Sequence, residues 1–318
     1  MSVLTYTFDA TTIHEIDNNL PCHVFVSQAA VETDLRVTAT SAGNLPVDAL
    51  RIVQRDATLC LEWASPITDT MTLLIEICAS ADALKCTKFV NNGPGSVYVD
   101  HWPLGPLAAD LTLIQNGSGR VCVRTAHASV ATLRAQTNGS GRVQLEAASL
   151  VVETIECATR GSGVTQLSVG AVTATSVDCS VAGSGSIHIA SPKAFTAASI
   201  QCAVSGSGNL SFAGHGTCQR VAIQVAGSGR VRTDAVAAHE AHIEIAGSGA
   251  VVVRAMDELE AKVVGSGVVR CVAPVPPMVS GSFTTLETAP SVPDHSCSMF
   301  PAREPTQCSG CGNSCRLM

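Results

Sequence analysis

Apolar and polar residues alternate along most of the chain, and the alternation follows a tripeptide that returns about every 22 residues. Gly-Ser-Gly occurs eight times, with first glycines at Gly117, Gly139, Gly161, Gly183, Gly206, Gly227, Gly247 and Gly265. The spacings between successive copies are 22, 22, 22, 23, 21, 20 and 18 residues. Self-similarity near this period is typical of a solenoid, in which each repeat packs only on its neighbours.

Aligning the copies on their first glycine separates two kinds of position. The residues six and four places before it, and four and six places after it, are mostly apolar, as at Ile155, Cys157, Leu210 and Phe212. The residues between them are largely polar. A period of two indicates strands, so each coil is expected to be a strand, a Gly-Ser-Gly bend, a second strand and a return segment. Coils stacked at roughly 4.8 Å would make a rod on the order of 40 Å long.

Both glycines of each tripeptide fall in the inward phase of this alternation, and the serine falls in the outward phase. A tight inward corner leaves no room for a Cβ, which explains glycine at both positions. The predicted structural corners are Gly117, Gly119, Gly139, Gly141, Gly161, Gly163, Gly183, Gly185, Gly206, Gly208, Gly227, Gly229, Gly247, Gly249, Gly265 and Gly267.

The fold class predicted from these patterns is all-β, a single-stranded parallel β-helix. Residues 1–92 lack the tripeptide but also alternate, and an open solenoid end needs a cap, so we expect strands that cap the solenoid and are continuous with it. Residues 93–271 are the expected β-helix. Residues 272–307 are rich in Pro, Ser and Thr and are expected to be a linker, followed by a Cys-rich tail at 308–318.

The N-terminal strands and the repeats together resemble a known family. The stretches "IHEIDNNLPCHVFVSQ" and "LRVTATSAGNLPVDALRIVQRDATLCLEW", followed by serial Gly-Ser-Gly coils, resemble the auto-transporter adhesin head domain, or GIN domain, over about residues 10–272. The resemblance implies a right-handed parallel β-helix with an adhesion or binding role.

Composition and charge narrow the function classes. Aromatic residues make up only 3% of the chain, which suits a thin interior of Val, Ala, Ile and Leu. The net charge is −7, with no basic face for nucleic acid, so that partner is not expected. We expect no signal peptide at the start and no spanning helix, because no apolar run reaches 18 residues. The 14 cysteines are then expected to be reduced thiols in a cytosolic compartment.

Two groups of side chains in the repeats could carry chemistry. Cys157, Cys179 and Cys202 share one inward column, where a metal or redox role competes with simple packing of a small buried hydrophobe, and packing is the favoured interpretation. His242 and Glu244 should face outward on the same side as a solvated pair. The outward acids are otherwise scattered and form no acid–base pair, so we expect no enzyme and no cofactor. A carbohydrate-active β-helix enzyme is kept as an alternative.

The chain ends in "QCSGCGNSCRLM", for which two interpretations compete. Cys297, Cys308, Cys311 and Cys315 could bind zinc, although a single Cys-x2-Cys pair on a proline-rich tether is a poor structural site. The favoured interpretation is lipid attachment, because "CRLM" resembles a C-a-a-X prenylation box at Cys315. One lipid chain anchors only marginally, so Cys308 and Cys311 are the expected palmitoylation sites.

These inferences combine into one hypothesis. The chain is expected to be a non-catalytic, adhesin-head-like scaffold or binding rod, anchored by its lipid on the cytosolic face of a membrane in a eukaryotic cell. Its expected partners are the membrane surface and a protein or glycan ligand of unknown identity. A soluble protein with a zinc-binding tail is the second alternative.

Overall fold

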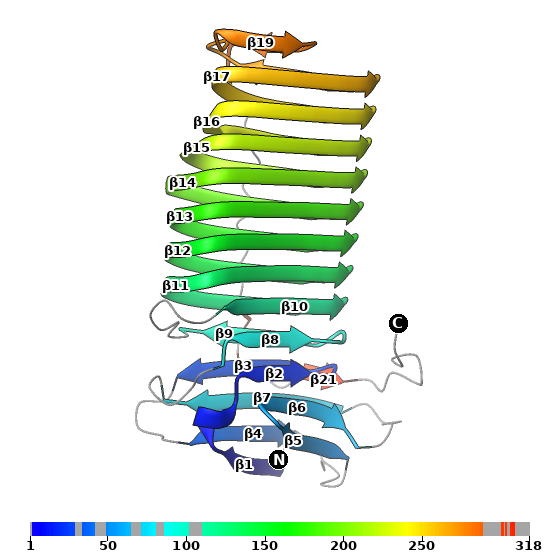
Figure 1. Ribbon diagram of the computed structural model, residues 1–318. Helices are drawn as coiled ribbons and strands as arrows, with labels where there is room; N and C mark the ends of the chain where they lie inside the picture. Colours follow the sequence, from blue (N-terminus) through cyan, green and yellow to red (C-terminus); the bar gives the residue numbers. More distant parts are fainter. Residues whose placement is uncertain are drawn as a thin grey trace.

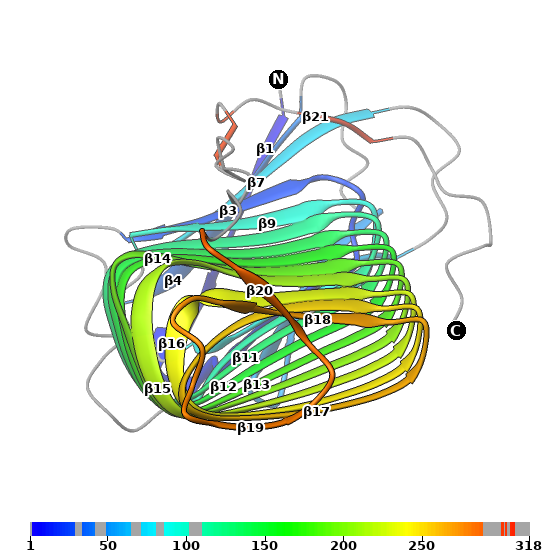
Figure 2. The same ribbon diagram turned by 90° about the horizontal axis from the view of Figure 1, so that it is seen from above.

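The structure, a computed structural model, describes residues 2–28, 34–41, 49–64, 71–80, 86–101, 110–288, 300–301, 303 and 306–308. The described strands form a rod of stacked coils, with the N-terminal layers at one end (Figure 1). Viewed down the axis, the coils superimpose around a common interior (Figure 2). The predicted all-β parallel solenoid is therefore confirmed.

Eight strands make up the regular part of the rod. They are β10 (Leu111–Gly117), β11 (Arg120–Gly139), β12 (Arg142–Gly161), β13 (Val164–Gly183), β14 (Ser186–Gly206), β15 (Asn209–Gly227), β16 (Arg230–Gly247) and β17 (Ala250–Gly265). From β11 on, each runs from one Gly-Ser-Gly corner, around a bend, to the first glycine of the next corner. We call the part before the bend the leading half and the part after it the trailing half.

Neighbouring coils pair in parallel and in register. Leu133 of β11 pairs with Ile155 of β12, and Gly139 pairs with Gly161. Residues at the same offset from the corner therefore stack along the axis, and the apolar columns read from the sequence line the interior. Most of their Val, Leu and Ile side chains have almost no exposed surface. The alternation thus places one side of each strand in a continuous core.

The two glycines of a corner are required for different reasons. Gly183 has φ +116°, and a Cβ there would lie 2.6 Å from the carbonyl oxygen of Gly161 in the coil beneath. Gly185 has ordinary backbone angles, but its Cβ would lie 2.5 Å from Cγ2 of Thr159. The first glycine therefore supplies a backbone conformation that L side chains avoid, and the second supplies space.

Differences in coil length are absorbed at the bend. The strands shorten from 21 residues in β14 to 16 in β17. The registers shift between Ser168 and Ala171, between Ser191 and Phe195, and at equivalent places in the later coils. Pairing from the middle of the trailing half through the Gly-Ser-Gly corner continues without a shift, so this part of every coil keeps its alignment.

The N-terminal layers continue the coils in an order that differs from the chain order. Each layer combines one strand that stacks with the trailing halves of the coils and one that stacks with their leading halves. These layers are β2 (Glu15–Asn18) with β3 (His23–Gln28), β6 (Thr58–Trp63) with β7 (Met71–Ala79), and β8 (Lys88–Asn91) with β9 (Ser96–Asp100). The β2/β3 layer pairs in parallel with β6/β7 on one side and with β8/β9 on the other. The β8/β9 layer in turn pairs with β10 and β11.

Antiparallel strands close this end of the rod. β4 (Leu35–Ser41) pairs antiparallel with β7, β1 (Ser2–Phe8) pairs antiparallel with β4, and β5 (Leu50–Arg55) pairs antiparallel with β6. A 3-10 turn at Ala10–Thr12 joins β1 to the first layer. The change of direction ends the parallel stacking. An open parallel edge would instead expose unpaired backbone groups to further strands.

The solenoid extends past its predicted end at residue 271. After β18 (Val268–Val272), β19 (Met278–Gly281) pairs in parallel with β17, and β20 (Thr284–Leu286) pairs with β18. Paired backbone thus continues into residues 272–307, the segment predicted to be a linker. The pattern missed these strands because β19 lies exposed on the last coil and has no inward apolar side, although its backbone is paired.

The corner geometry predicts unequal effects within one tripeptide. Gly183→Ala should lower the free energy of unfolding by about 2 kcal/mol or more, because it forces an alanine into a glycine-only conformation and against the Gly161 carbonyl. Ser184→Ala is the matched control, since Ser184 is exposed between the two glycines. Thermal and urea unfolding followed by circular dichroism measures both. Equal stability of the two variants would contradict the role assigned to the corner.

Candidate functional site

One outward face of the rod is formed by the trailing halves of β12–β17. Side chains one, three, five and seven places before the first glycine point outward on this face. Several of them are small, including Ala158, Ser180, Ala203 and Ala226. Small side chains from neighbouring coils stack on one another along this face, and three hollows of the described part of the rod lie on it.

The largest of these three hollows has a volume of about 520 Å³ and crosses the trailing halves of β13–β17. Its floor is mainly small and apolar, from Ala182, Ser205, Ala226 and Ala246. Glu244 and Lys262 supply charges at the C-terminal part of the lining. The hollow follows the rod axis across five strands and therefore suits an extended ligand better than a compact one.

The second hollow, of about 470 Å³, adjoins it on β11–β15 and is more polar. Its lining includes Glu156, Asp178, Arg160 and Gln201. Arg134 Nε donates a hydrogen bond to Glu156 Oε2 at 2.7 Å. This hydrogen bond is the main cause that lowers the pKa of Glu156, so the carboxylate stays ionised and is not a proton donor.

The third hollow, of about 330 Å³, contains the outward His242. His242 Nε2 lies 3.7 Å from Glu244 Oε1 on the same strand, as the alternation predicted. Its closer partner is Glu260 of β17, whose Oε2 lies 2.9 Å from His242 Nδ1. Nearby, Arg220 pairs with Glu240 at 2.9 Å. These are exposed pairs between adjacent coils, each of which contributes about 0–1 kcal/mol.

The predicted cysteine column is present in the interior. Cys157, Cys179 and Cys202 pair in register on β12, β13 and β14 and are buried. A hydrogen bond with Cys157, followed by burial, raises the pKa of Cys179, and burial raises the pKa of Cys202. Within the described residues, no cluster of three or more His, Cys, Asp or Glu side chains could hold a metal ion. The column therefore acts as core packing.

The tail cysteines are largely outside the described residues. Cys297, Cys311 and Cys315 lie outside them, and for Cys308 the structure describes its place in β21 (Thr306–Cys308). Both the lipid interpretation and the zinc interpretation of the tail thus stay predictions. The described part of the chain has no helix that is long and apolar enough to cross a bilayer.

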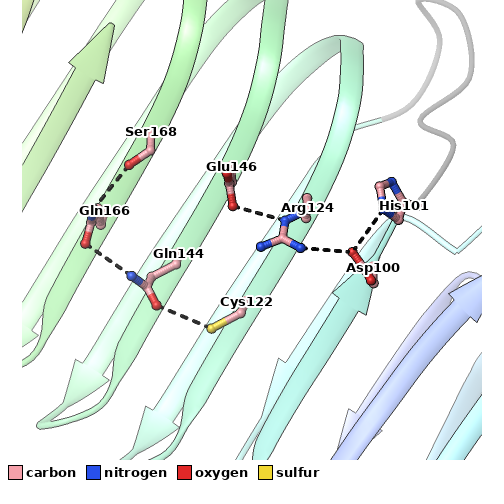
Figure 3. Close-up of polar contacts among 8 residues, drawn as sticks. All are labelled: Asp100, His101, Cys122, Arg124, Gln144, Glu146, Gln166 and Ser168. Carbon is pink, nitrogen blue, oxygen red and sulfur yellow. Dashed lines mark hydrogen bonds and ion pairs between the residues drawn. The ribbon is translucent and has the colours of Figure 1, made fainter. Parts of the chain in front are cut away.

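The leading halves form a second outward face, which carries a polar ladder (Figure 3). Cys122 Sγ donates to Gln144 Oε1 at 3.5 Å, and Gln144 Nε2 donates to Gln166 Oε1 at 3.2 Å. Gln166 Nε2 then donates to Ser168 Oγ at 3.3 Å. Beside this ladder, Arg124 binds Glu146 at 3.1 Å and lies 3.7 Å from Asp100 (Figure 3).

Toward the N-terminal end the same column becomes aromatic. The rings of Phe25 and Tyr98 stack with centroids 5.2 Å apart, and His23 meets Tyr98 edge-on at 5.4 Å. Burial, with a smaller effect from Arg120, lowers the pKa of His23, which keeps this ring neutral. Sequence reasoning missed the patch. Its signal was two outward aromatic residues on strands of a chain that contains only two tyrosines and seven phenylalanines.

The buried thiols should be unreactive in the folded rod. Burial raises the pKa of Cys218 to about 12, so almost no thiolate forms at pH 8, and the neighbouring coils exclude reagents from Cys202 and Cys218. Iodoacetamide labelling read by mass spectrometry should modify both only after unfolding in urea. The half-exposed Cys78 is the internal control and should react first. Rapid native labelling of Cys202 would contradict a closed interior.

The comparisons with known proteins agree with the solenoid. Residues 171–273, about a third of the chain, match the family model described as putative auto-transporter adhesin, head GIN domain. This supports, over that part, the resemblance noted in the sequence. No curated protein matches the chain.

A solved bacterial structure shares the architecture. A putative lipid binding protein from Parabacteroides distasonis ATCC 8503 aligns with a TM-score of 0.52 and 18% identity, over 85% of this chain and 97% of that one. A putative adhesin from the same strain aligns with a TM-score of 0.47 and 16% identity, over 90% and 94% of the two chains. At such identities the likeness is one of fold. The chain is thus similar in fold to this lipid binding protein and, in its later coils, similar in sequence to the adhesin-head family.

Proposed function

We propose that this chain is a non-catalytic binding rod that is held at a membrane by lipid on its C-terminal cysteines. The observation that carries the binding role is the alignment of three hollows on one face, built from the same positions of successive coils. Such a surface presents equivalent groups at roughly 4.8 Å intervals along the axis. An extended protein segment or a glycan chain fits this geometry.

The chemistry of the hollows supports binding over catalysis. Hydrolysis or elimination on a sugar needs a protonated acid placed beside a base. Glu156 in the second hollow is held ionised by Arg134, and His242 in the third is engaged by Glu244 and Glu260. The lining of the largest hollow is mainly Ala, Val and Ser side chains, which can cover a ligand but do not transfer protons, and its charged residues are Glu244 and Lys262. The carbohydrate-active alternative is therefore less well supported than binding.

The tether rests on the motif Cys315-Arg316-Leu317-Met318, which acts as a prenylation box where Met318 is the last residue of the protein. Palmitoylation of Cys308 and Cys311 would provide the second lipid that stable anchoring requires. The part of this proposal that concerns the cytosolic face follows from prenylation, which occurs in the cytosol of eukaryotic cells.

Filling the hollow tests the binding face. Ala203→Arg with Ala226→Arg places two long charged side chains on the hollow's apolar floor, and we expect at least a tenfold loss of binding to any ligand that the native rod selects from peptide and glycan arrays. Thr173→Arg adds a charge at an exposed position outside the three hollows and is the matched control. Unchanged binding by the double variant, or equal loss in the control, would contradict the assigned face.

Removing the prenyl acceptor tests the tether. In eukaryotic cells, Cys315→Ser should move the protein from the membrane pellet to the soluble fraction, because the motif loses its only thiol acceptor. Cys297→Ser is the matched control and should pellet like the native protein. Mass spectrometry of the C-terminal peptide should show a farnesyl group.

Replacing Cys308 and Cys311 together should weaken membrane retention while the prenyl group remains. Unchanged pelleting of Cys315→Ser would remove the anchor from the proposal. Stoichiometric zinc in the purified protein, lost on replacement of the same cysteines, would instead favour the zinc-binding tail.

A further inference from the structure

A small apolar patch lies outside the main core near the N-terminal end of the rod. Phe25, Leu74, Tyr98 and Cys122 form it, on β3, β7, β9 and β11. Their strand neighbours Val24, Val26, Val97 and Val99 belong to the interior core, so the patch faces the opposite side of the sheet. Phe25 and Tyr98 are nevertheless only 3% exposed. Outward aromatic rings on a solenoid are normally solvated, so this burial needs a cover.

Phe300 provides part of the cover. Its ring centroid lies 5.8 Å from that of Tyr98, and the Arg124 guanidinium lies 4.3 Å from the centre of the Phe300 ring. Phe300 is therefore inserted between an aromatic ring and a cation, both of which favour contact with a π face. Arg124 is held in place on its other side by Glu146.

Arg303 contacts the other end of the same patch. Its guanidinium lies 5.9 Å from the centre of the Phe25 ring and 3.8 Å from Glu76 Oε1 on β7. The contacts thus run without a break from Arg124 through Phe300, Tyr98 and Phe25 to Arg303. A cation at each end of a row of aromatic rings is a specific arrangement that an aromatic–arginine segment can complete.

Backbone pairing adds a third kind of contact. β21 pairs antiparallel with the start of β7, with Thr306 opposite Leu73 and Cys308 opposite Met71. The edge used by β21 is where β7 extends beyond its partner β3, whose pairing begins at His23 with Leu74. The added strand therefore completes an edge that β3 leaves open (Figure 1).

We infer that Phe300, Arg303 and β21 form an intramolecular clasp, in which the patch on β3, β9 and β11 is a docking site for the chain's own C-terminal segment. The clasp holds this segment at the N-terminal end of the rod, opposite β19. Cys315 is seven residues after Cys308, and an extended chain of seven residues spans at most roughly 25 Å. Resting on the proposed tether, this means that the rod stands with its N-terminal layers toward the membrane.

Hydrogen exchange on the purified, unlipidated full chain tests the clasp itself. Phe300→Ala with Arg303→Ala removes one aromatic pair and two cation–π contacts, which corresponds to about a tenfold or larger shift toward the open form. Amides of residues 306–308 and of the first residues of β7 should exchange faster by that factor, while β12–β16 should be unchanged. Met278→Ala, at an exposed site on the opposite end, is the control.

A charge exchange guards against a general loss of folding. Arg303→Glu alone should open the clasp because it faces Glu76, and adding Glu76→Arg should restore part of the protection of residues 306–308. Native exchange at 306–308 as fast as in a free peptide, or no change in the Phe300/Arg303 variant, would overturn the clasp. These readouts need no lipid, so they separate failure of the clasp from failure of the tether, which the fractionation of Cys315→Ser measures.

Discussion

The parallel, in-register hydrogen bonding between coils is the constraint on which the rest of the structure depends. It places each residue directly over its counterpart about 4.8 Å away, so every position must tolerate a copy of itself. At the corners, the carbonyl of Gly161 lies where a Cβ on Gly183 would be, and only glycine can repeat there. In the interior, Val, Leu, Ile and Cys side chains stack in buried columns. Close backbone approach at the corners and a filled core between them thus both require the same residue types to recur at the same positions of every coil.

The same constraint shapes the surface charges. Like charges stacked at this distance repel, and some outward positions place opposite charges on neighbouring coils: Arg124 pairs with Glu146, and Arg134 with Glu156. Each exposed pair contributes little to stability, about 0–1 kcal/mol. Its main effect is to avoid repulsion between residues that the register stacks on one another. Not every stacked pair is of opposite sign: Arg120 pairs with Arg142, Glu156 with Asp178, and Glu240 with Glu258.

Regular parts of the fold could be predicted from the sequence because one local rule recurs in them. Alternation and corner spacing placed the strands of β10–β17 and their inward columns. They could not predict that β6/β7 stacks outside β2/β3, because alternation identifies the side of a strand but not its neighbour. The aromatic patch was missed for a related reason. Phe25 and Phe300 are far apart in the sequence, and Phe300 lies in a stretch whose composition favours a linker.

The two outward faces of the rod differ in chemistry and so do its two ends, so the rod is asymmetric both around and along its axis. The trailing face is open and hollowed by small side chains, whereas the leading face has a polar ladder that ends in a covered aromatic patch. The N-terminal end is closed by antiparallel strands, while the last coil exposes Met278 and Val279. A rod with distinct faces and ends can hold a ligand on one side while its orientation is fixed elsewhere.

The bend between the leading and trailing halves has an evolutionary consequence. Because strands of 16 to 21 residues stack with their corners aligned, the bend is where the chain can gain or lose residues without disturbing its neighbours. Insertions between Ser191 and Phe195, or between Ser211 and Gly216, would emerge as loops on one edge of the rod. Sequence insertions and deletions in a rod of this kind would therefore accumulate along the line of bends. The stacked strands and the hollowed face would stay unaltered.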